Sequence, residues 1–103
     1  MIQKRKNEDE RVINMDYVVK YDDLEVMIEL NAKRTRDEII AQYIALRKEK
    51  GYTQEDIAKA TKIARPNVAR IESGKNSPTI EVLTKLAHAL DMQLELRFVE
   101  KLQ

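Results

Sequence analysis

The first helical pattern in the chain is short. Asp22 precedes three apolar residues at the i, i+3, i+4 spacing, Leu24, Met27 and Ile28. An acidic side chain in that place can accept hydrogen bonds from the free N–H groups of a first helical turn. The order therefore predicts an N-cap followed by a short amphipathic helix.

The segment ahead of this helix has little to bury. Residues 1–11 are polar and highly charged, which predicts a disordered tail. Residues 17–21 read Tyr-Val-Val-Lys-Tyr and favour a short β-strand. We therefore expect residues 1–34 to form an N-terminal extension made of a charged tail, a short strand and a short helix.

A longer helical pattern starts at a second cap signal. Thr35 and Glu38 form a T-x-x-E capping box, which predicts a separate helix from Thr35 to about Lys50, ended by Gly51. One apolar stripe is enough for a surface helix, and a second stripe needs another contact. That contact is either the short helix before it or a dimer partner. The two stripes are Ile39/Tyr43/Leu46 and Ile40/Ile44.

Three further helices follow. Thr53 starts the first of them. Pro66 suits a first turn and disfavours helical backbone in the residue before it, so the next helix should begin within a residue of Arg65, and Gly74 should end it. Thr79 caps the last helix, which has one apolar face. The residues of that face are Ile80, Leu83, Leu86, Ala87 and Leu90.

The chain then changes period. Residues 93–98 alternate polar and apolar side chains, as a half-buried strand does. A lone strand is not stable, so its backbone groups need a partner, either residues 17–21 or the same strand of a second subunit. We expect residues 92–103 to form a dimerisation strand. Its candidate contact residues are Leu94, Leu96 and Phe98.

The middle of the chain has the features of a helix-turn-helix. Ala58 is small enough for two helices to cross closely, and Ile63 supplies an apolar plug for the turn. Val68 and Ile71 give the second helix an inward face. A helix fits the major groove of DNA, where Arg pairs with guanine and Asn with adenine. The residues presented outward for that purpose are Arg65, Asn67 and Arg70.

The sequence also resembles a known family. The segments LRKEKGYTQEDIA, VARIESGKNSPT and LTKLAHAL occur in order between Leu46 and Leu90, and they make the chain similar to the phage repressor/Cro, or XRE, helix-turn-helix family. The resemblance implies a mainly α, five-helix, lambda-repressor-like helix-turn-helix fold. It places the DNA-binding domain over residues 35–91. It implies a sequence-specific transcriptional repressor that binds an operator in double-stranded DNA, and we expect this repressor to act as a homodimer through the C-terminal strand.

The same resemblance implies roles for individual residues. Gln54 matches a position that meets the DNA backbone and supports the base-reading side chains. The base-reading positions are matched by Arg65, Pro66, Asn67 and Arg70. The loop that contacts phosphate is matched by Lys75 and Asn76. Arg47 and Glu72 match an internal ion pair between the first and third helices of the family.

The chain departs from the family pattern at the turn and at the start of the recognition helix. Lys62 stands where the family usually has Gly. In a left-handed conformation it is strained by on the order of 1 kcal/mol, and its amine becomes a candidate phosphate contact. Ala64 stands where Ser or Thr often caps the recognition helix, and Pro66 has no side-chain donor. The operator sequence is therefore not transferable from relatives.

Charge is balanced overall but uneven along the chain. Nineteen Lys and Arg against eighteen Asp and Glu give a formal net charge of +1, which taken alone argues against a nucleic-acid binder. Residues 7–29 carry eight acids against two cations, a net charge of −6, whereas residues 47–75 carry eight cations against four acids, a net charge of +4. The acidic segment masks a basic one that contains the recognition helix.

Composition excludes several classes of site. The chain has no Cys, so thiolate zinc sites and cysteine nucleophiles are absent, and a single His rules out a cluster of imidazole ligands. The carboxylates form no recognisable dyad, so we expect no catalytic residues, no metal and no cofactor. No apolar run approaches the roughly 20 residues of a membrane span, and no signal peptide is evident. We expect a cytoplasmic protein without membrane contact.

A more specific role is suggested by the layout of the chain. An XRE core with an added N-terminal segment and a C-terminal strand resembles HigA- and HipB-type antitoxins, which repress their own operon and bind a toxin. The rival hypothesis is a stand-alone repressor. The acidic stretch 16–29 fits a basic toxin electrostatically, or else its apolar residues only cover Ile40 and Ile44.

Overall fold

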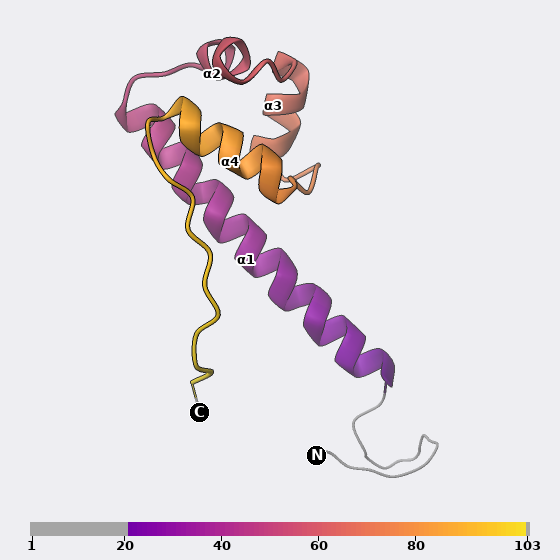
Figure 1. Ribbon diagram of the computed structural model, residues 1–103. Coiled ribbons are helices and arrows are strands. Elements are labelled where there is room, and N and C mark those ends of the chain that lie inside the picture. Colours follow the sequence, from indigo (N-terminus) through magenta and orange to yellow (C-terminus); the bar gives the residue numbers. More distant parts are fainter. Residues whose placement is uncertain (1–20, 103) are drawn as a thin grey trace. The chain divides into compact units, whose positions relative to one another are not determined.

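The computed structural model describes residues 21–102 (Figure 1). The described chain is helical, with α1 (Tyr21–Glu49), α2 (Gln54–Thr61), α3 (Arg65–Glu72) and α4 (Ile80–Ala89). It divides into two units between Arg36 and Asp37. The second unit holds the C-terminal part of α1 together with the other three helices. The strand expected at 17–21 lies outside the described residues except for Tyr21, which is the first residue of α1.

The N-terminal half contains one helix where the sequence predicted two. Thr35 lies inside α1, so it does not cap a new helix, and residues 21–102 contain four helices rather than five. Residues 30–34, Leu-Asn-Ala-Lys-Arg, include neither Gly nor Pro and are mostly good helix formers. Continuing the helix through them costs less than breaking it to use a side-chain cap.

Both apolar stripes of α1 belong to the core of the second unit. Ile40 and Tyr43 are buried, and Ile39, Ile44 and Leu46 pack against the same core cluster. The prediction that the preceding short helix covers the second stripe is wrong. The two segments form one continuous helix, so one cannot fold back onto the other. The apolar residues of the first unit are instead exposed, and they are Leu24, Val26, Met27, Ile28 and Leu30.

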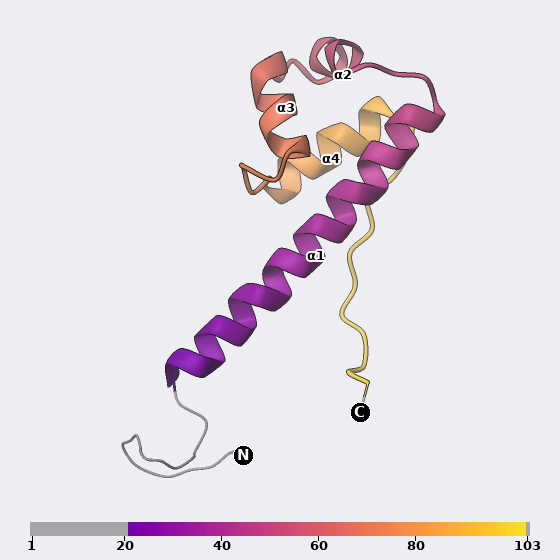
Figure 2. The same cartoon turned by 180° about the vertical axis from the view of Figure 1, so that it is seen from behind.

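The core of the second unit is aliphatic apart from Tyr43. α2 packs against both α3 and α4, and the turn between α2 and α3 is short (Figure 2). Ala58 is buried at this crossing, as the sequence predicted. The most deeply buried side chains come from these three helices and from the residue that follows α4. They are Ile57, Val68, Leu86 and Leu90.

The helix starts in this unit follow the cap signals. Thr53 accepts a hydrogen bond from Asp56 N at 3.1 Å, and the Asp56 carboxylate accepts one from Thr53 N at 2.9 Å, so the two form a reciprocal capping box. Thr79 caps α4 by accepting from Val82 N at 3.1 Å. α3 begins at Arg65, as expected, but its N-cap residue makes no side-chain hydrogen bond.

Left-handed residues end the helices. Gly51 has φ 79° and Gly74 has φ 82° after α1 and α3, at the predicted stops. Asp91, with φ 58°, takes the same role after α4, where Met92 N donates to Ala87 O at 2.8 Å. Sequence patterns did not indicate a left-handed residue here, because Asp adopts this conformation less often than Gly.

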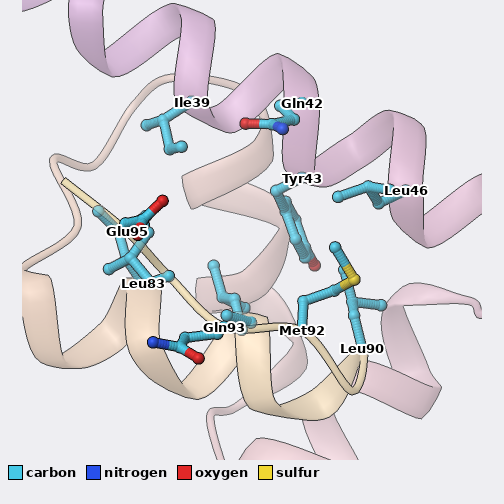
Figure 3. Close-up of a pocket in the computed structure, with 12 residues that line it drawn as sticks. Ile39, Gln42, Tyr43, Leu46, Leu83, Leu90, Met92, Gln93 and Glu95 are labelled. Atoms are coloured by element: carbon cyan, nitrogen blue, oxygen red, sulfur yellow. The ribbon is translucent and has the colours of Figure 1, made fainter. Parts of the chain in front are cut away.

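Residues 91–102 form neither helix nor strand within the described chain. Leu94 is half-buried and lines a groove, together with Leu83 and Leu90, between α4 and the C-terminal part of α1 (Figure 3). Within residues 21–102 the predicted strand at 93–98 is not formed, and this described part of the chain contains no other strand that it could pair with.

Candidate nucleic-acid interface

α3 has one buried side and one exposed side. Val68 is 0% exposed and Ile71 is also buried, and both anchor the helix to the core. Arg65, Asn67 and Arg70 are exposed. The helix therefore presents two guanidinium groups and one carboxamide to solvent, the side chains that read base edges in a major groove.

Two of these side chains contact each other. Arg70 Nη1 donates to Asn67 Oδ1 at 2.8 Å, across one helical turn. The bond holds the guanidinium and orients the amide so that the Asn67 NH₂ group points its donors away from Arg70. Pro66, at the second helical position, is exposed beside them and offers only its apolar ring.

The turn between α2 and α3 contains a strained cation. Lys62 has φ 63° and ψ 21°, and its N–H donates to Ala58 O at 2.8 Å. Thr61 supports the turn, because its buried hydroxyl donates to Ile57 O at 2.7 Å and accepts from Ile63 N at 3.2 Å. Lys62 itself is exposed, so its amine is available at the entrance to α3.

A buried ion pair joins α1 to α3. Arg47 Nε and Nη2 each donate to one oxygen of Glu72 at 2.9 Å, a bidentate geometry, and Arg47 Nη1 donates to Tyr52 O at 2.8 Å. Arg47 is 8% exposed. Because both charges are enclosed, Arg47 contributes little to the field at the surface of the molecule.

Glu72 has two further partners. Tyr43 Oη donates to Glu72 Oε2 at 2.9 Å, and Gln54 Nε2 donates to Glu72 Oε1 at 3.1 Å. Burial, and then the Glu72 carboxylate, raise the pKa of Tyr43 well above its usual range, so the phenol remains a donor. Gln54 is half-buried and is held at the start of α2 by this bond, which links it to the end of α3.

Sequence reasoning placed Tyr43 among the apolar residues and missed its polar contact. A Tyr in an otherwise aliphatic stripe was the available signal, because a buried phenol nearly always needs a hydrogen-bond partner. Its partner was not evident, since Tyr43 and Glu72 lie 29 residues apart in the chain.

The remaining predicted contacts lie at the ends of α3. Lys75 and Asn76 are exposed after Gly74, and their N–H groups donate to Arg70 O at 2.9 and 3.3 Å, which orders this loop against the helix. Arg65 Nε lies 4.0 Å from Glu55 Oε1 in an exposed pair, which restrains Arg65 only weakly.

The described residues offer no metal site and no membrane span. Among the described residues, no three His, Asp or Glu side chains are grouped so that they could hold a metal ion. None of the helices between residues 21 and 102 combines the length and apolar character of a membrane span.

Comparison with known proteins agrees with this geometry. The helix-turn-helix family model matches residues 44–96, more than half of the chain, and the protein belongs to that family. No curated protein and no solved structure matches the chain. The fold and the family together define an XRE-like helix-turn-helix protein. It is a DNA-binding transcription regulator.

Proposed function

We propose that the protein is a dimeric, sequence-specific repressor that reads its operator with α3. The observation that carries this proposal is the polar exposed side of α3, with Arg65, Asn67 and Arg70 opposite the buried Val68 and Ile71. In a major groove, Arg65 and Arg70 would pair with guanine. Asn67 would donate its free NH₂ group to a base acceptor while Arg70 occupies its oxygen.

Contacts to the DNA backbone would come from residues flanking α3. Lys62 and Lys75 are exposed cations on either side of the helix, and Asn76 adds a polar side chain. Gln54, held by Glu72, retains an oxygen and one N–H for a neighbouring group or a phosphate. Pro66 would touch the methyl group of a thymine.

Dimerisation supplies the affinity that one short helix lacks. Two helix-turn-helix units read half-sites one helical turn apart, about 34–36 Å. The exposed apolar residues Leu96 and Phe98, together with Leu94, are the proposed dimerisation contacts.

The test is operator selection from random DNA, followed by binding of variants to the selected site. Arg70→Ala is expected to lose roughly 1–3 kcal/mol on the selected site and to relax specificity at one base pair of each half-site. The matched control, Lys75→Ala, should weaken binding about equally on all sequences and reduce the salt dependence. Equal loss on every sequence for Arg70→Ala would contradict base reading.

A second candidate function is toxin neutralisation by the N-terminal part of α1. The observation that favours it is the exposed apolar set around Met27 and Ile28, interspersed with the acids Asp23, Glu25 and Glu29. Such a surface suits a basic protein partner. In this case the protein is the antitoxin of a toxin–antitoxin operon.

The candidate partner is the product of the neighbouring reading frame, which this role predicts to be a small basic protein. The Ile28→Asp variant should no longer form a complex with this purified partner, while its operator binding is retained. Deleting residues 1–31 should do the same. Unchanged partner binding in both variants would rule out this surface.

A further inference from the structure

The segment after α4 begins in contact with the core and ends without one. Leu94 lines a groove of about 290 Å³ whose walls include Ile39, Leu83 and Leu90 (Figure 3). Leu96 is 54% exposed and Phe98 is 106% exposed. Gln93 and Glu95 line the same groove, so the extended segment starts at a groove of mixed polarity and continues into solvent.

The backbone N–H and C=O groups of this segment also lack hydrogen-bond partners in the described part of the chain. Within residues 21–102, no backbone hydrogen bond is made by residues 93–99. A segment with alternating side chains and free backbone groups is an open strand edge, which another strand can pair with. Its own sequence indicates which strand that is.

We propose that residues 93–99 pair antiparallel with the same residues of a second copy, with the two-fold axis at Leu96. The inference rests on the proposed dimer and specifies its register. When two identical antiparallel strands pair about an axis, residues equally far from the axis residue lie opposite each other. With the axis at Leu96, Glu95 lies opposite Arg97 of the partner subunit, and Leu94 lies opposite Phe98 of the partner subunit. The two-fold axis repeats each of these pairs once on its other side.

The neighbouring registers are less favourable. An axis at Glu95 or at Arg97 places two like charges directly opposite each other, which destabilises a sheet. An axis at Leu94 or at Phe98 keeps the apolar face but separates Glu95 from Arg97. Only the register at Leu96 pairs these opposite charges on one face and the three apolar positions on the other.

This register also supplies an occupant for the groove. Cross-strand neighbours have Cβ atoms about 4.5–5.5 Å apart, so Phe98 of the partner subunit lies beside Leu94 on the same face. Because Leu94 lines the groove, that ring enters the space between α1 and α4. Each copy thus covers the groove of the other.

Single-cysteine variants of the full chain test the register, since the protein has no native Cys. Leu96→Cys should form a disulfide-linked dimer on mild oxidation, because residues at the axis have Cα atoms about 4.5–5.5 Å apart, within disulfide range. Leu94→Cys and Phe98→Cys place their sulfurs about 13 Å apart along the strands and should remain monomeric on a non-reducing gel. Cross-linking at 94 or 98, or at no position, would overturn the register.

Charge reversal gives an independent readout without oxidation. Glu95→Arg and Arg97→Glu should each weaken the dimer on the order of tenfold by sedimentation, and the double variant should restore it. A double variant as weak as the singles would contradict the pairing. Binding to the selected DNA separates the two proposals, because a cross-linked Leu96→Cys dimer that selects no DNA sequence would refute the repressor and not the register.

Discussion

Lys62 is a single residue in a left-handed conformation that glycine adopts more easily. Its left-handed conformation, φ 63°, is one that a side chain with a Cβ atom adopts at a cost. The Ala58 carbonyl and the Thr61 hydroxyl hold the turn in place around it. The strained cation stands at the start of α3, where its amine would meet a DNA phosphate under the proposed function.

Lys62→Gly is expected to raise the free energy of unfolding by about 0.5–1 kcal/mol, because Gly adopts the left-handed region without steric strain. Urea denaturation measures the change. Lys59→Gly, at an exposed position inside α2, is the control and should lower the free energy of unfolding by a similar amount. If both variants were equally destabilised, the turn would carry no strain.

At the scale of elements, the start of α2 depends on one carboxylate. Hydrogen bonds from the backbone and the hydroxyl of Thr53 lower the pKa of Asp56 below its ordinary value of 3.8. Because the folded-state pKa is the lower one, the stabilisation is present above the unfolded-state pKa. It is lost as the pH falls through the folded-state value.

Asp56→Asn should therefore lower the Tm near pH 7, and the difference from the unsubstituted protein should shrink as the pH falls below 3.8. Thermal melts followed by circular dichroism from pH 7 to pH 2 measure both effects. Glu81→Gln removes an acid from the first turn of α4 that makes no cap hydrogen bond, and its effect should be smaller. A pH-independent difference for Asp56→Asn would contradict the role of the charge.

At the scale of the whole molecule, local signals were predictable and distant ones were not. The inward positions Ala58, Val68 and Ile71 and the caps at Thr53 and Thr79 follow from spacing within one or two turns, and the structure contains them. The continuity of α1 did not follow, because a cap contributes only about 1 kcal/mol and competes with the propensity of the residues before it.

In the candidate site, too, local features were predictable from the sequence and distant contacts were not. Periodicity alone indicates which side of α3 is exposed, and the structure agrees for Arg65, Asn67 and Arg70. The contacts that orient the site, Arg70 to Asn67 and Tyr43 to Glu72, depend on rotamers and on tertiary approach.

The continuous helix α1 is expected to behave as two segments in amide hydrogen exchange. Between residues 40 and 47 one side of the helix packs into the core through Ile40, Tyr43 and Arg47, so the amides of this stretch should exchange only through global unfolding. The amides of residues 26–34, in a stretch whose side chains are exposed, should exchange through local opening at a small free-energy cost, since short helices without packing are marginal in water. Equal protection along α1 would contradict this difference.

A ligand that covers residues 24–30 would slow exchange in that segment alone. Amide exchange in the N-terminal half of α1 would then show whether a ligand occupies that surface. The protection of the DNA-binding domain would not change.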